Sequence, residues 1–350
     1  MAKDPVTLQD VADAAGVSIA TASRALTGKS RVSKQTTAHV VRVASRLGYR
    51  VNVFGRALRE GTGRTVGVVV PVISNPFFGQ LVHHLEAELL DHGLDLLIAD
   101  SHGETLREKG RLRMLVERRV EGIIVVPSDA EESAPALQDA ARTTPLVQLD
   151  RRVEGVAVDY VGVDNSRGMS LLMEHLNSHG VREVVLVASD STTSAGRERR
   201  EAYEREATRM GMVMQDPILD EFTLEFGQRA AQQLATRGSM AEAVIAGDDL
   251  IATGLVIGLK KAGLSIPEDV LITGFDGTML ANICDPMLTT IEQPFASLAR
   301  ETVRALVRRI ADRDAPVMFS RLSPSLRAAA STGGVPAPET ENADAEAASS

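Results

Sequence analysis

The chain has 350 residues and a formal net charge of −9, with 44% hydrophobic and 24% charged side chains, enough for two or three domains with substantial cores. Its single cysteine, Cys284, excludes a disulfide framework within the chain. The N-terminus has no apolar signal segment and no apolar run reaches the roughly 18–20 residues of a membrane span, so we expect a soluble cytoplasmic protein.

Charge is divided unequally along the chain. Residues 1–63 contain ten Lys or Arg and four Asp or Glu, a net charge of +6, and the remainder carries −15. A small basic head on an acidic body indicates that only the head contacts nucleic acid phosphates.

Three short helices are predicted near the N-terminus. The first spans about 7–15 and ends at Gly16, since glycine readily adopts the left-handed conformation found after a helix. Ser18 and Ser33 are suited to cap the second and third helices. The apolar stripe predicted for the third helix comprises Val40, Val41, Ala44 and Leu47. Two helices joined by a tight Gly-Val-Ser turn are typical of a helix-turn-helix unit.

The second of these helices is predicted to read DNA in the major groove. Its N-terminal half presents Ser18, Ile19, Ala20, Thr21 and Arg24. Arg24 is suited to a bidentate contact with guanine, whereas Ile19 and Ala20 offer only apolar contact. The residues predicted to contact phosphates are Thr7, Ser23, Lys29, Ser30, Arg31 and Lys34. The alternative is a three-helix bundle without a role in DNA binding.

This head resembles that of the LacI/GalR family of transcriptional regulators. The resemblance is carried by VTLQDVADAAGVS at residues 6–18, TASRAL at 21–26, Val32-Ser33 and LGY at 47–49. It implies that Ile19, Ala20 and Arg24 occupy the operator-reading positions, and that the partner is double-stranded, pseudo-palindromic operator DNA.

Residues 51–63 join the head to the body and form at most a marginal helix, since isolated helices this short rarely persist in water. The family resemblance implies a hinge helix that folds on operator binding, with DNA contacts from Asn52 and Arg56 and with Leu58 inserted into the minor groove. Val51 replaces the family's usual proline, and Gly55 falls inside the helix. We therefore expect a hinge without stable structure in the absence of DNA; the alternative is a plain linker.

From residue 64 onward, apolar strands alternate with amphipathic helices, which predicts parallel sheets covered on both faces. The predicted strands are 65–71, 95–99, 122–126, 145–149, 183–188, 243–246 and 270–274. The predicted helices are 78–92, 105–119, 167–179, 197–210, 226–237 and 250–262. The fold class is thus an all-α helix-turn-helix head plus an α/β core of two doubly wound parallel-sheet lobes.

The core resembles the periplasmic-binding-protein fold of the same family. The resemblance implies a head at 1–50, a hinge at 51–63 and a core at 64–331, followed by a disordered tail at 332–350. Lobe one is expected at about 64–163 and 294–322, and lobe two at about 164–291 and 323–331.

Parallel sheets bind ligands beyond the carboxyl ends of their strands. The residues found there are Asn75–Phe78, Asp150-Arg151, Asp248-Asp249 and Asp276. The resemblance implies that Arg199 and Asp276 bind two adjacent hydroxyl groups of the ligand and that Asp248 binds a further hydroxyl. It also implies that the aromatic ring of Phe222 packs on one face of the ligand. The complete predicted ligand set is Asn75, Phe77, Phe78, Asp150, Arg199, Phe222, Asp248, Asp276 and Gln293.

Three aspartates against one arginine disfavour an anionic ligand, so we expect a neutral sugar or cyclitol, with a nucleoside or nucleobase as the alternative. No catalytic or metal residues and no cofactor are expected. The glycines at 61–67 precede a strand and so do not form a dinucleotide motif. Asp248 and Asp249 are too close in sequence to act as a glycosidase pair. His175 and His179 have the spacing of zinc ligands but lack the surrounding motif.

The function expected is therefore a repressor controlled allosterically by a small molecule, acting as a nucleoid-associated, cytoplasmic homodimer without membrane contact. A two-fold dimer is expected because one helix-turn-helix covers only half an operator. The tail lacks the apolar heptads of a tetramerisation helix. The remaining alternatives are an extracytoplasmic solute-binding protein and a carbohydrate-active protein without a role in DNA binding.

Overall fold

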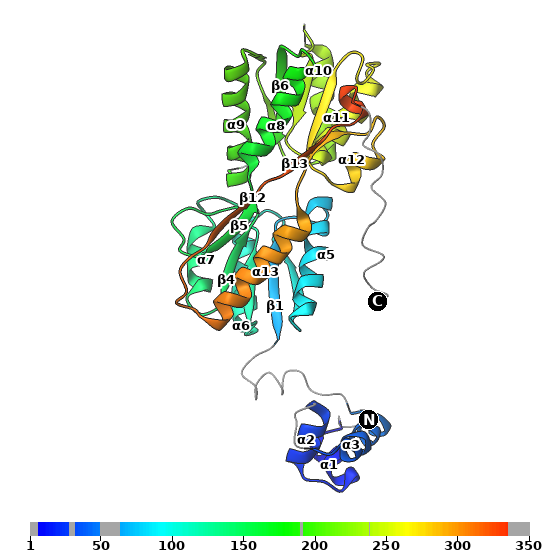
Figure 1. Ribbon diagram of the computed structural model, residues 1–350, viewed down its shortest axis with the longest axis vertical. Coiled ribbons are helices and arrows are strands. Elements are labelled where there is room, and N and C mark those ends of the chain that lie inside the picture. Colours follow the sequence, from blue (N-terminus) through cyan, green and yellow to red (C-terminus); the bar gives the residue numbers. More distant parts are fainter. Residues whose placement is uncertain (1–5, 28–31, 50–63, 190–191, 238, 335–350) are drawn as a thin grey trace. The chain divides into compact units, whose positions relative to one another are not determined.

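The computed structural model describes residues 6–27, 32–49, 64–189, 192–237 and 239–334. The chain divides into two compact units, one ending at Gly63 and the other beginning at Arg64. Figure 1 shows the elements of each unit, which we describe separately as the head and the body.

The head contains helices α1 (Leu8–Ala15), α2 (Ile19–Thr27) and α3 (Lys34–Leu47). Thr7 begins α1 with a capping box, in which the side chains of Thr7 and Asp10 each accept a hydrogen bond from the other residue's backbone N–H. Gly16 follows α1 with a φ of +64°, a conformation that suits glycine. The three helices enclose a small core of valine and alanine side chains.

The apolar face of α3 differs from the predicted stripe at one position. Val40 and Ala44 are buried as predicted, but Val41 is 48% exposed and Val43 takes its place in the core with 5% exposure. The prediction for Val41 is wrong because positions 40, 43, 44 and 47 follow the i, i+3, i+4, i+7 spacing of one helix face.

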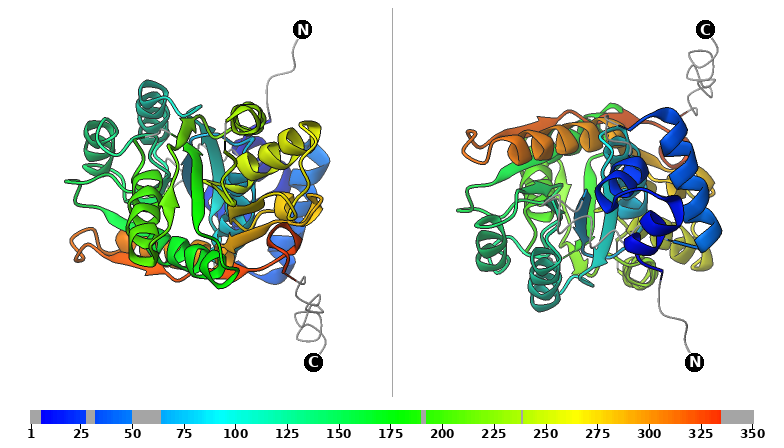
Figure 2. Two further views of the ribbon diagram at one scale, coloured as in Figure 1. Left: turned by 90° about the horizontal axis from the view of Figure 1, so that it is seen from above. Right: turned by 90° about the horizontal axis from the view of Figure 1, so that it is seen from below.

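The first lobe of the body is a parallel six-stranded sheet in the order β12-β5-β4-β3-β1-β2. The strand bounds are β1 Thr65–Val70, β2 Asp95–Asp100, β3 Gly122–Val125, β4 Leu146–Leu149, β5 Asp159–Val163 and β12 Phe319–Leu322. Helices α5 (Pro76–Asp91) and α13 (Phe295–Ala311) pack on one face, and α6 (Thr105–Glu117) and α7 (Ala134–Ala141) on the other (Figures 1 and 2).

The second lobe is built on a sheet in the order β13-β11-β10-β9-β6-β7, with β8 also paired to β6. The strand bounds are β6 Glu183–Ser189, β7 Val213–Met214, β8 Ile218–Asp220, β9 Ala243–Ala246, β10 Leu271–Asp276, β11 Thr289–Glu292 and β13 Ser325–Arg327. Helices α8 (Asn165–Ser178) and α9 (Ser194–Met210) cover one face, and α10 (Leu224–Thr236) and α11 (Asp249–Lys261) the other. The short α12 (Met279–Ile283) and the 3-10 helix η1 (Ala330–Thr332) complete the lobe.

The chain passes between the lobes three times, after β5, after β11 and between β12 and β13. Each lobe therefore contains segments that are far apart in the sequence, and the carboxyl ends of β1 and β4 in lobe one approach those of β6, β9 and β10 in lobe two (Figure 1). The predicted fold class, a helix-turn-helix head with a core of two parallel-sheet lobes, is confirmed.

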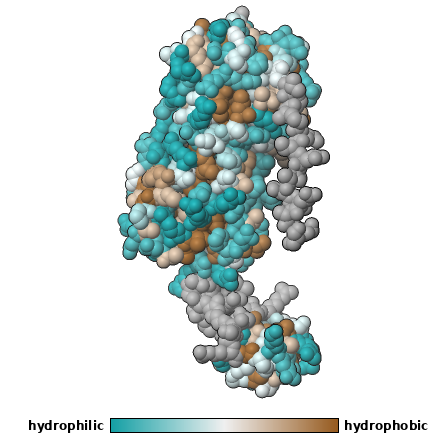
Figure 3. Space-filling view, in the orientation of Figure 1, coloured by the Kyte–Doolittle hydropathy of each residue, from teal (hydrophilic) through white to brown (hydrophobic). Residues whose placement is uncertain are grey.

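Polar side chains cover most of the face drawn in Figure 3, with apolar residues scattered among them. No helix in the described part of the chain has the length and hydrophobicity of a membrane-spanning segment.

Candidate functional site

Helix α2 presents the predicted base-reading side chains on its first turns. Ile19, Ala20 and Arg24 are exposed, and Ile19 retains 43% of its accessible surface, unusually high for an isoleucine. The Arg24 Nε donates to the Ala20 carbonyl at 3.0 Å, which lays the side chain along the helix surface. The exposed face of α2 thus has the composition expected of a helix that contacts base edges.

Three residues assigned to DNA contact, Thr7, Ser18 and Thr21, also form hydrogen bonds within the head. The Ser18 hydroxyl accepts a hydrogen bond from the Thr21 backbone N–H at 3.1 Å and lies 2.8 Å from the Thr21 hydroxyl. Thr7 caps α1, and Ser23 is half-buried. The predictions that fall outside the described residues are those for Lys29, Ser30, Arg31, Val51, Asn52, Gly55, Arg56 and Leu58.

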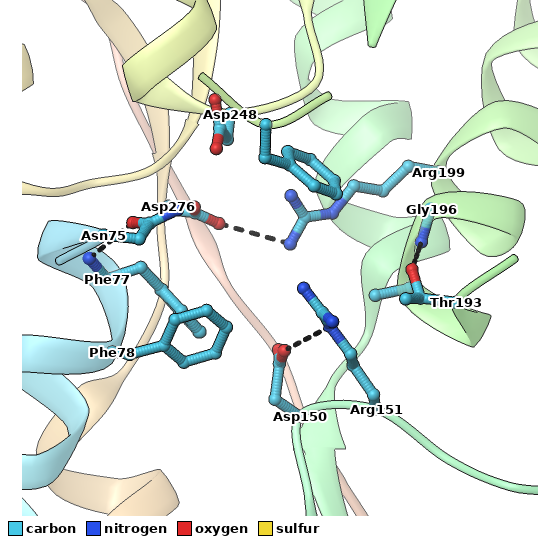
Figure 4. Close-up of a pocket in the computed structure, with 12 residues that line it drawn as sticks. Asn75, Phe77, Phe78, Asp150, Arg151, Thr193, Gly196, Arg199, Asp248 and Asp276 are labelled. Carbon is cyan, nitrogen blue, oxygen red and sulfur yellow. Dashed lines mark hydrogen bonds and ion pairs between the residues drawn. The ribbon is translucent and has the colours of Figure 1, made fainter. Parts of the chain in front are cut away.

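The lobes of the body form a cavity of about 30 Å³, partly open at its edge, between the carboxyl ends of their strands. The residues that line it are Asn75, Phe77, Phe78, Asp150, Arg151, Thr193, Ala195, Gly196, Arg199, Phe222, Asp248 and Asp276 (Figure 4). Lobe one supplies the beginning of α5 and the end of β4, and lobe two supplies α9 and the ends of β9 and β10.

Local backbone structure explains how the strand-end side chains reach the cavity. Asn75 caps α5 through a hydrogen bond from the Phe77 N–H, and Asp248 caps α11 through one from the Ile251 N–H at 2.7 Å. Asp150 and Asp276 have φ values of +64° and +112°, which are rare for residues other than glycine. Such strained positions cluster at functional sites, where the surrounding structure holds them in place.

Arg199 connects three elements of lobe two at the cavity wall. Its Nη2 lies 3.2 Å from the Asp276 Oδ1, its Nη1 donates to the Gly247 carbonyl at 2.8 Å, and its Nε donates to the Asn165 Oδ1 at 2.9 Å. The guanidinium also stacks 3.7 Å from the centre of the Phe275 ring. All these contacts fix the charged end of Arg199 beside Asp276.

Gln293 supports the cavity although it is not among the lining residues. Its Nε2 donates to the Asp276 Oδ1 at 2.7 Å, so it holds the same carboxylate oxygen as Arg199. Its Oε1 is buried without a hydrogen-bond partner, as is the Oδ1 of Asp150. Buried polar atoms of this kind are costly in a folded protein, which favours a role in binding a polar group.

Burial dominates the electrostatics of the cavity. It raises the pKa of Asp276 well above the usual aspartate value, although the nearby Arg199 acts in the opposite direction. Burial also raises the pKa of Asp150 and of Asp248, and a side-chain hydrogen bond with Asn75 opposes the shift at Asp248. These carboxylates therefore stabilise hydrogen-bond donors but resist an additional negative charge.

The structure brings the predicted ligand-binding residues together at the cavity. The balance of acidic and basic residues there differs from the prediction. Four residues outside that set also line the cavity: Arg151, Thr193, Ala195 and Gly196. Arg151 makes the balance three aspartates to two arginines, which corrects the predicted three to one. The sequence signal for Arg151 is its position directly after strand β4. Thr193 and Gly196 lie after strand β6, at the start of α9, so the same strand-end position is their signal.

Asp249 lies beside the cavity, but its carboxylate forms hydrogen bonds with other residues of the body. Its Oδ2 accepts hydrogen bonds from the Thr278 N–H and hydroxyl at 2.6 and 2.9 Å, and its Oδ1 accepts one from the Thr290 hydroxyl at 2.6 Å. Burial raises the pKa of Asp249 to about 7. In the described ranges, no cluster of His, Cys, Asp and Glu is arranged to hold a metal ion.

Comparison with known proteins identifies both units. Residues 7–52 match the family described as "Bacterial regulatory proteins, lacI family", and residues 173–332 match the periplasmic binding protein-like domain. The HTH-type transcriptional repressor CytR of Escherichia coli K12 is 31% identical over 304 residues, which cover 86% of this chain and 89% of CytR. PurR of Photobacterium profundum is 27% identical over 91% of this chain and 96% of its own length.

Solved structures show the same architecture. A lac repressor dimer bound to operator has a TM-score of 0.85 with 24% identity, covering 94% of this chain and 99% of that one. A structure of a transcriptional regulator CelR-cellobiose complex has a TM-score of 0.71 with 27% identity over 93% and 99% of the two chains. A LacI-family regulator of Enterococcus faecium with bound ribose has a TM-score of 0.68 with 28% identity over 77% and 98%.

The family, the fold and the absence of catalytic function are therefore as predicted. The head provides a helix-turn-helix, the body provides two lobes around a buried polar cavity, and CytR exceeds 30% identity over most of both chains. The chain belongs to the LacI family of bacterial regulatory proteins and is a DNA-binding transcriptional regulator rather than an enzyme.

Proposed function

We propose that this chain is an operator-binding repressor whose affinity for DNA is controlled by a neutral, polyhydroxylated ligand bound between its lobes. The observation that carries this proposal is the arrangement of Arg199 and Asp276, with Asp248 on the neighbouring strand end. A guanidinium donor and two carboxylate acceptors on one wall suit a pair of adjacent hydroxyl groups.

The opposite wall supplies apolar surface. Phe77 and Phe78 come from the beginning of α5, and their ring centres lie 5.0 Å apart in an edge-to-face arrangement. Phe222 lines the cavity from lobe two. An aromatic face covers the C–H groups of a sugar ring while polar groups fix its hydroxyls, the usual composition of a small-molecule site.

The charges of the cavity favour a ligand without formal charge. Asp150, Asp248 and Asp276 outnumber Arg151 and Arg199, and both arginines already lie beside carboxylates. A phosphate or carboxylate on the ligand would meet these buried acids at close range, at a high electrostatic cost. Supporting precedents are the CelR complex with cellobiose and the E. faecium regulator with ribose.

A nucleoside is the second candidate, because one feature of the cavity suits a flat ring. The Arg151 guanidinium lies over the Phe78 ring, 5.5 Å from its centre, so a cationic group and an aromatic group, each able to stack on a base, lie together at the cavity. A ribose unit carries the same adjacent hydroxyls as a free sugar, so Arg199 and Asp276 serve both ligand classes.

We expect the repressor to act as a homodimer on a pseudo-palindromic operator, since a single helix-turn-helix covers one half-site. The sequence after residue 332 contains no leucine or isoleucine and cannot form an apolar heptad seam. The repressor is thus expected to remain a dimer, and light scattering that gives a tetramer mass would contradict this part of the proposal.

A ligand screen tests the proposal directly. The purified chain is heated with D-ribose, D-xylulose, cellobiose, myo-inositol, adenosine or uridine, and its melting temperature is measured. A ligand that binds only the native state raises the melting temperature, by an amount that corresponds to about 2.7 kcal/mol at 100 times its Kd. We expect at least one compound to do so, and Asp276→Asn to abolish the shift.

Asp285→Asn is the matched control, because Asp285 is exposed and pairs with Lys260 away from the cavity. It should retain the shift. Ribose 5-phosphate and glucuronate are added to the screen as charged counterparts. If either of these stabilises the chain while none of the neutral compounds does, the assignment of a neutral ligand is wrong.

A further inference from the structure

A buried glutamate lies behind the cavity in lobe one. Glu108 belongs to α6 and is fully buried, and it is not among the residues that line the cavity. Its Oε2 accepts a hydrogen bond at 2.6 Å from the N–H of Ser128, in the loop that follows β3. Glutamate is almost never fully buried in proteins unless a partner compensates its charge, so the surroundings of Glu108 are informative.

The peptide group between Pro127 and Ser128 connects Glu108 to the cavity. Its N–H donates to the Glu108 Oε2, and its carbonyl oxygen accepts a hydrogen bond from the Arg151 Nη1 at 3.4 Å. One peptide group therefore has a carboxylate at its positive end and a guanidinium at its negative end. In a buried region, hydrogen bonds in such a chain polarise one another, which strengthens the interaction between the charged groups at its two ends.

The two charged groups also act on each other electrostatically. Burial raises the pKa of Glu108, whereas hydrogen bonds from the neighbouring serines and the positive charge of Arg151 oppose this rise. Burial lowers the pKa of Arg151, and the carboxylates of Asp150, Asp276 and Glu108 oppose this fall. Glu108 and Arg151 therefore stabilise each other in their charged forms.

Arg151 lies between two carboxylates. On the side of the cavity, its Nε lies 3.8 Å from the Asp150 Oδ2 and its guanidinium lies over the Phe78 ring (Figure 4). On the other side, the peptide group connects it to Glu108. With Glu108 included, four carboxylates act on the two arginines of the cavity, so the positive charge of Arg151 is more than balanced.

We propose that Glu108 is a positioning and specificity-determining residue of the ligand site, which fixes the Arg151 guanidinium through the Pro127–Ser128 peptide group and offsets its charge. Arg151 can then donate hydrogen bonds to a neutral ligand without attracting an anionic one. The part of this proposal that concerns the charge of the ligand rests on the proposed function, whereas the coupling of Glu108 to Arg151 does not.

The first test measures this coupling in the full chain without ligand. The variants are Glu108→Gln, which keeps the length of the side chain and an acceptor oxygen but removes the charge, Arg151→Met, and the two combined. Urea unfolding at pH 8 and constant protein concentration gives the unfolding equilibrium constant of each. The factor by which Glu108→Gln increases this constant should be about fivefold or more smaller in the Arg151→Met background, because residues in one hydrogen-bond network are coupled.

Glu242→Gln is the matched control for this cycle. The Glu242 carboxylate also accepts a hydrogen bond from a backbone N–H, that of Glu183 at 3.2 Å. Glu242 precedes β9 and Glu183 begins β6, so both lie at the opposite ends of the lobe-two strands from the cavity. Glu242→Gln and Arg151→Met should act independently, so that their factors multiply to within about twofold. The same independence between Glu108→Gln and Arg151→Met would overturn the proposal.

The second test compares ligands that differ in charge. Calorimetric titration at pH 8 measures the Kd of three neutral and charged pairs: D-ribose and ribose 5-phosphate, adenosine and adenosine 5′-phosphate, and D-glucuronamide and D-glucuronate. The affinity for the charged compound relative to its neutral counterpart should be about fivefold or more higher in Glu108→Gln than in the native chain, because a negative charge near the cavity has been removed. This ratio should not change in Glu242→Gln.

The outcomes separate the two parts of the proposal. If Glu108→Gln weakens the binding of charged and neutral compounds by the same factor, the substitution has only damaged the site and the specificity role is wrong. If none of the six compounds binds either protein, the specificity role also fails, and the ligand screen shows whether the proposed ligand class fails with it. The unfolding cycle decides in every case whether Glu108 is coupled to Arg151.

Discussion

Arg199 and Asp276 form an ion pair, with 3.2 Å between the Arg199 Nη2 and the Asp276 Oδ1. Arg199 belongs to α9, whereas Asp276 ends β10, so the pair joins residues that are 77 positions apart in the sequence. Gln293 holds the same oxygen from the other side. The groups assigned to the ligand hydroxyls are therefore preorganised, which lowers the entropy cost of binding.

The first prediction concerns the stability of this pair. Arg199→Ala should lower the free energy of unfolding by about 3–5 kcal/mol, because it leaves the buried Asp276 carboxylate without its positive partner. Urea unfolding of the isolated body measures the change. Arg205→Ala is the control, since Arg205 pairs with Glu206 at a half-exposed position and should cost about 1 kcal/mol or less. Equal losses in the two variants would contradict the structural role of Arg199.

The second prediction concerns pH and Asp249. Burial raises its pKa from 3.8 to about 7, so the folded protein holds a proton that the unfolded chain releases at lower pH. Stability contributed by this proton is therefore lost as pH rises from about 4 to about 7, by up to about 4 kcal/mol. Asp249→Asn should remove this loss, because an amide mimics the protonated acid.

Other groups titrate in the same range, and the comparison of variants separates them. Burial lowers the pKa of His84 and of His175, so those residues make stability increase as pH rises through the range below 6.5. The difference in unfolding free energy between the native chain and Asp249→Asn isolates Asp249. If this difference is the same at pH 5 and pH 8, the assignment is wrong.

The third prediction concerns two adjacent valines of the head. Val43→Ala should lower the stability of the head by about 2 kcal/mol, because it removes buried methyl groups and leaves a cavity. Val41→Ala should change it by less than about 0.5 kcal/mol, because Val41 is half-exposed. Thermal unfolding followed by circular dichroism measures both, and equal effects would contradict the orientation of α3.

The fourth prediction concerns base reading by α2. Arg24→Ala should weaken binding to a DNA site selected by the native chain by about 1–3 kcal/mol, and should weaken binding to random DNA much less. Fluorescence anisotropy at constant salt measures both affinities, because phosphate contacts depend strongly on salt. Lys34→Ala is the control for a phosphate contact and should weaken binding to the selected site and to random DNA equally. If Arg24→Ala lost equal affinity for the selected site and for random DNA, Arg24 would have no base-specific role.

The head was largely predictable from the sequence because its signals are local. Thr7, Ser18 and Ser33 mark helix starts and Gly16 and Gly48 mark ends, and the structure places caps at these positions. The alternating strands and helices of the body were predictable for the same reason. The long α13 was missed even though Leu298, Val303 and Leu306 are buried at helical spacing, so periodicity alone was sufficient to predict it.

The cavity was predictable only in part. The rule that ligands bind beyond strand ends located Asp150, Asp248 and Asp276, and family resemblance supplied Arg199. The size of the cavity depends on how two lobes meet, and no local pattern encodes that distance. The contact of Arg152 with Ser194 joins residues 42 positions apart in two different lobes, so only the folded structure reveals it.

The most direct test measures the affinity of the full chain for its selected DNA site with and without a compound from the ligand screen. We expect a stabilising compound to weaken DNA binding by about fivefold or more, the range of typical allosteric coupling. Asp276→Asn should bind the DNA as the native chain does but should no longer respond to the compound. Unchanged DNA affinity of the native chain in the presence of a bound, stabilising compound would contradict control of the operator by the cavity between the lobes.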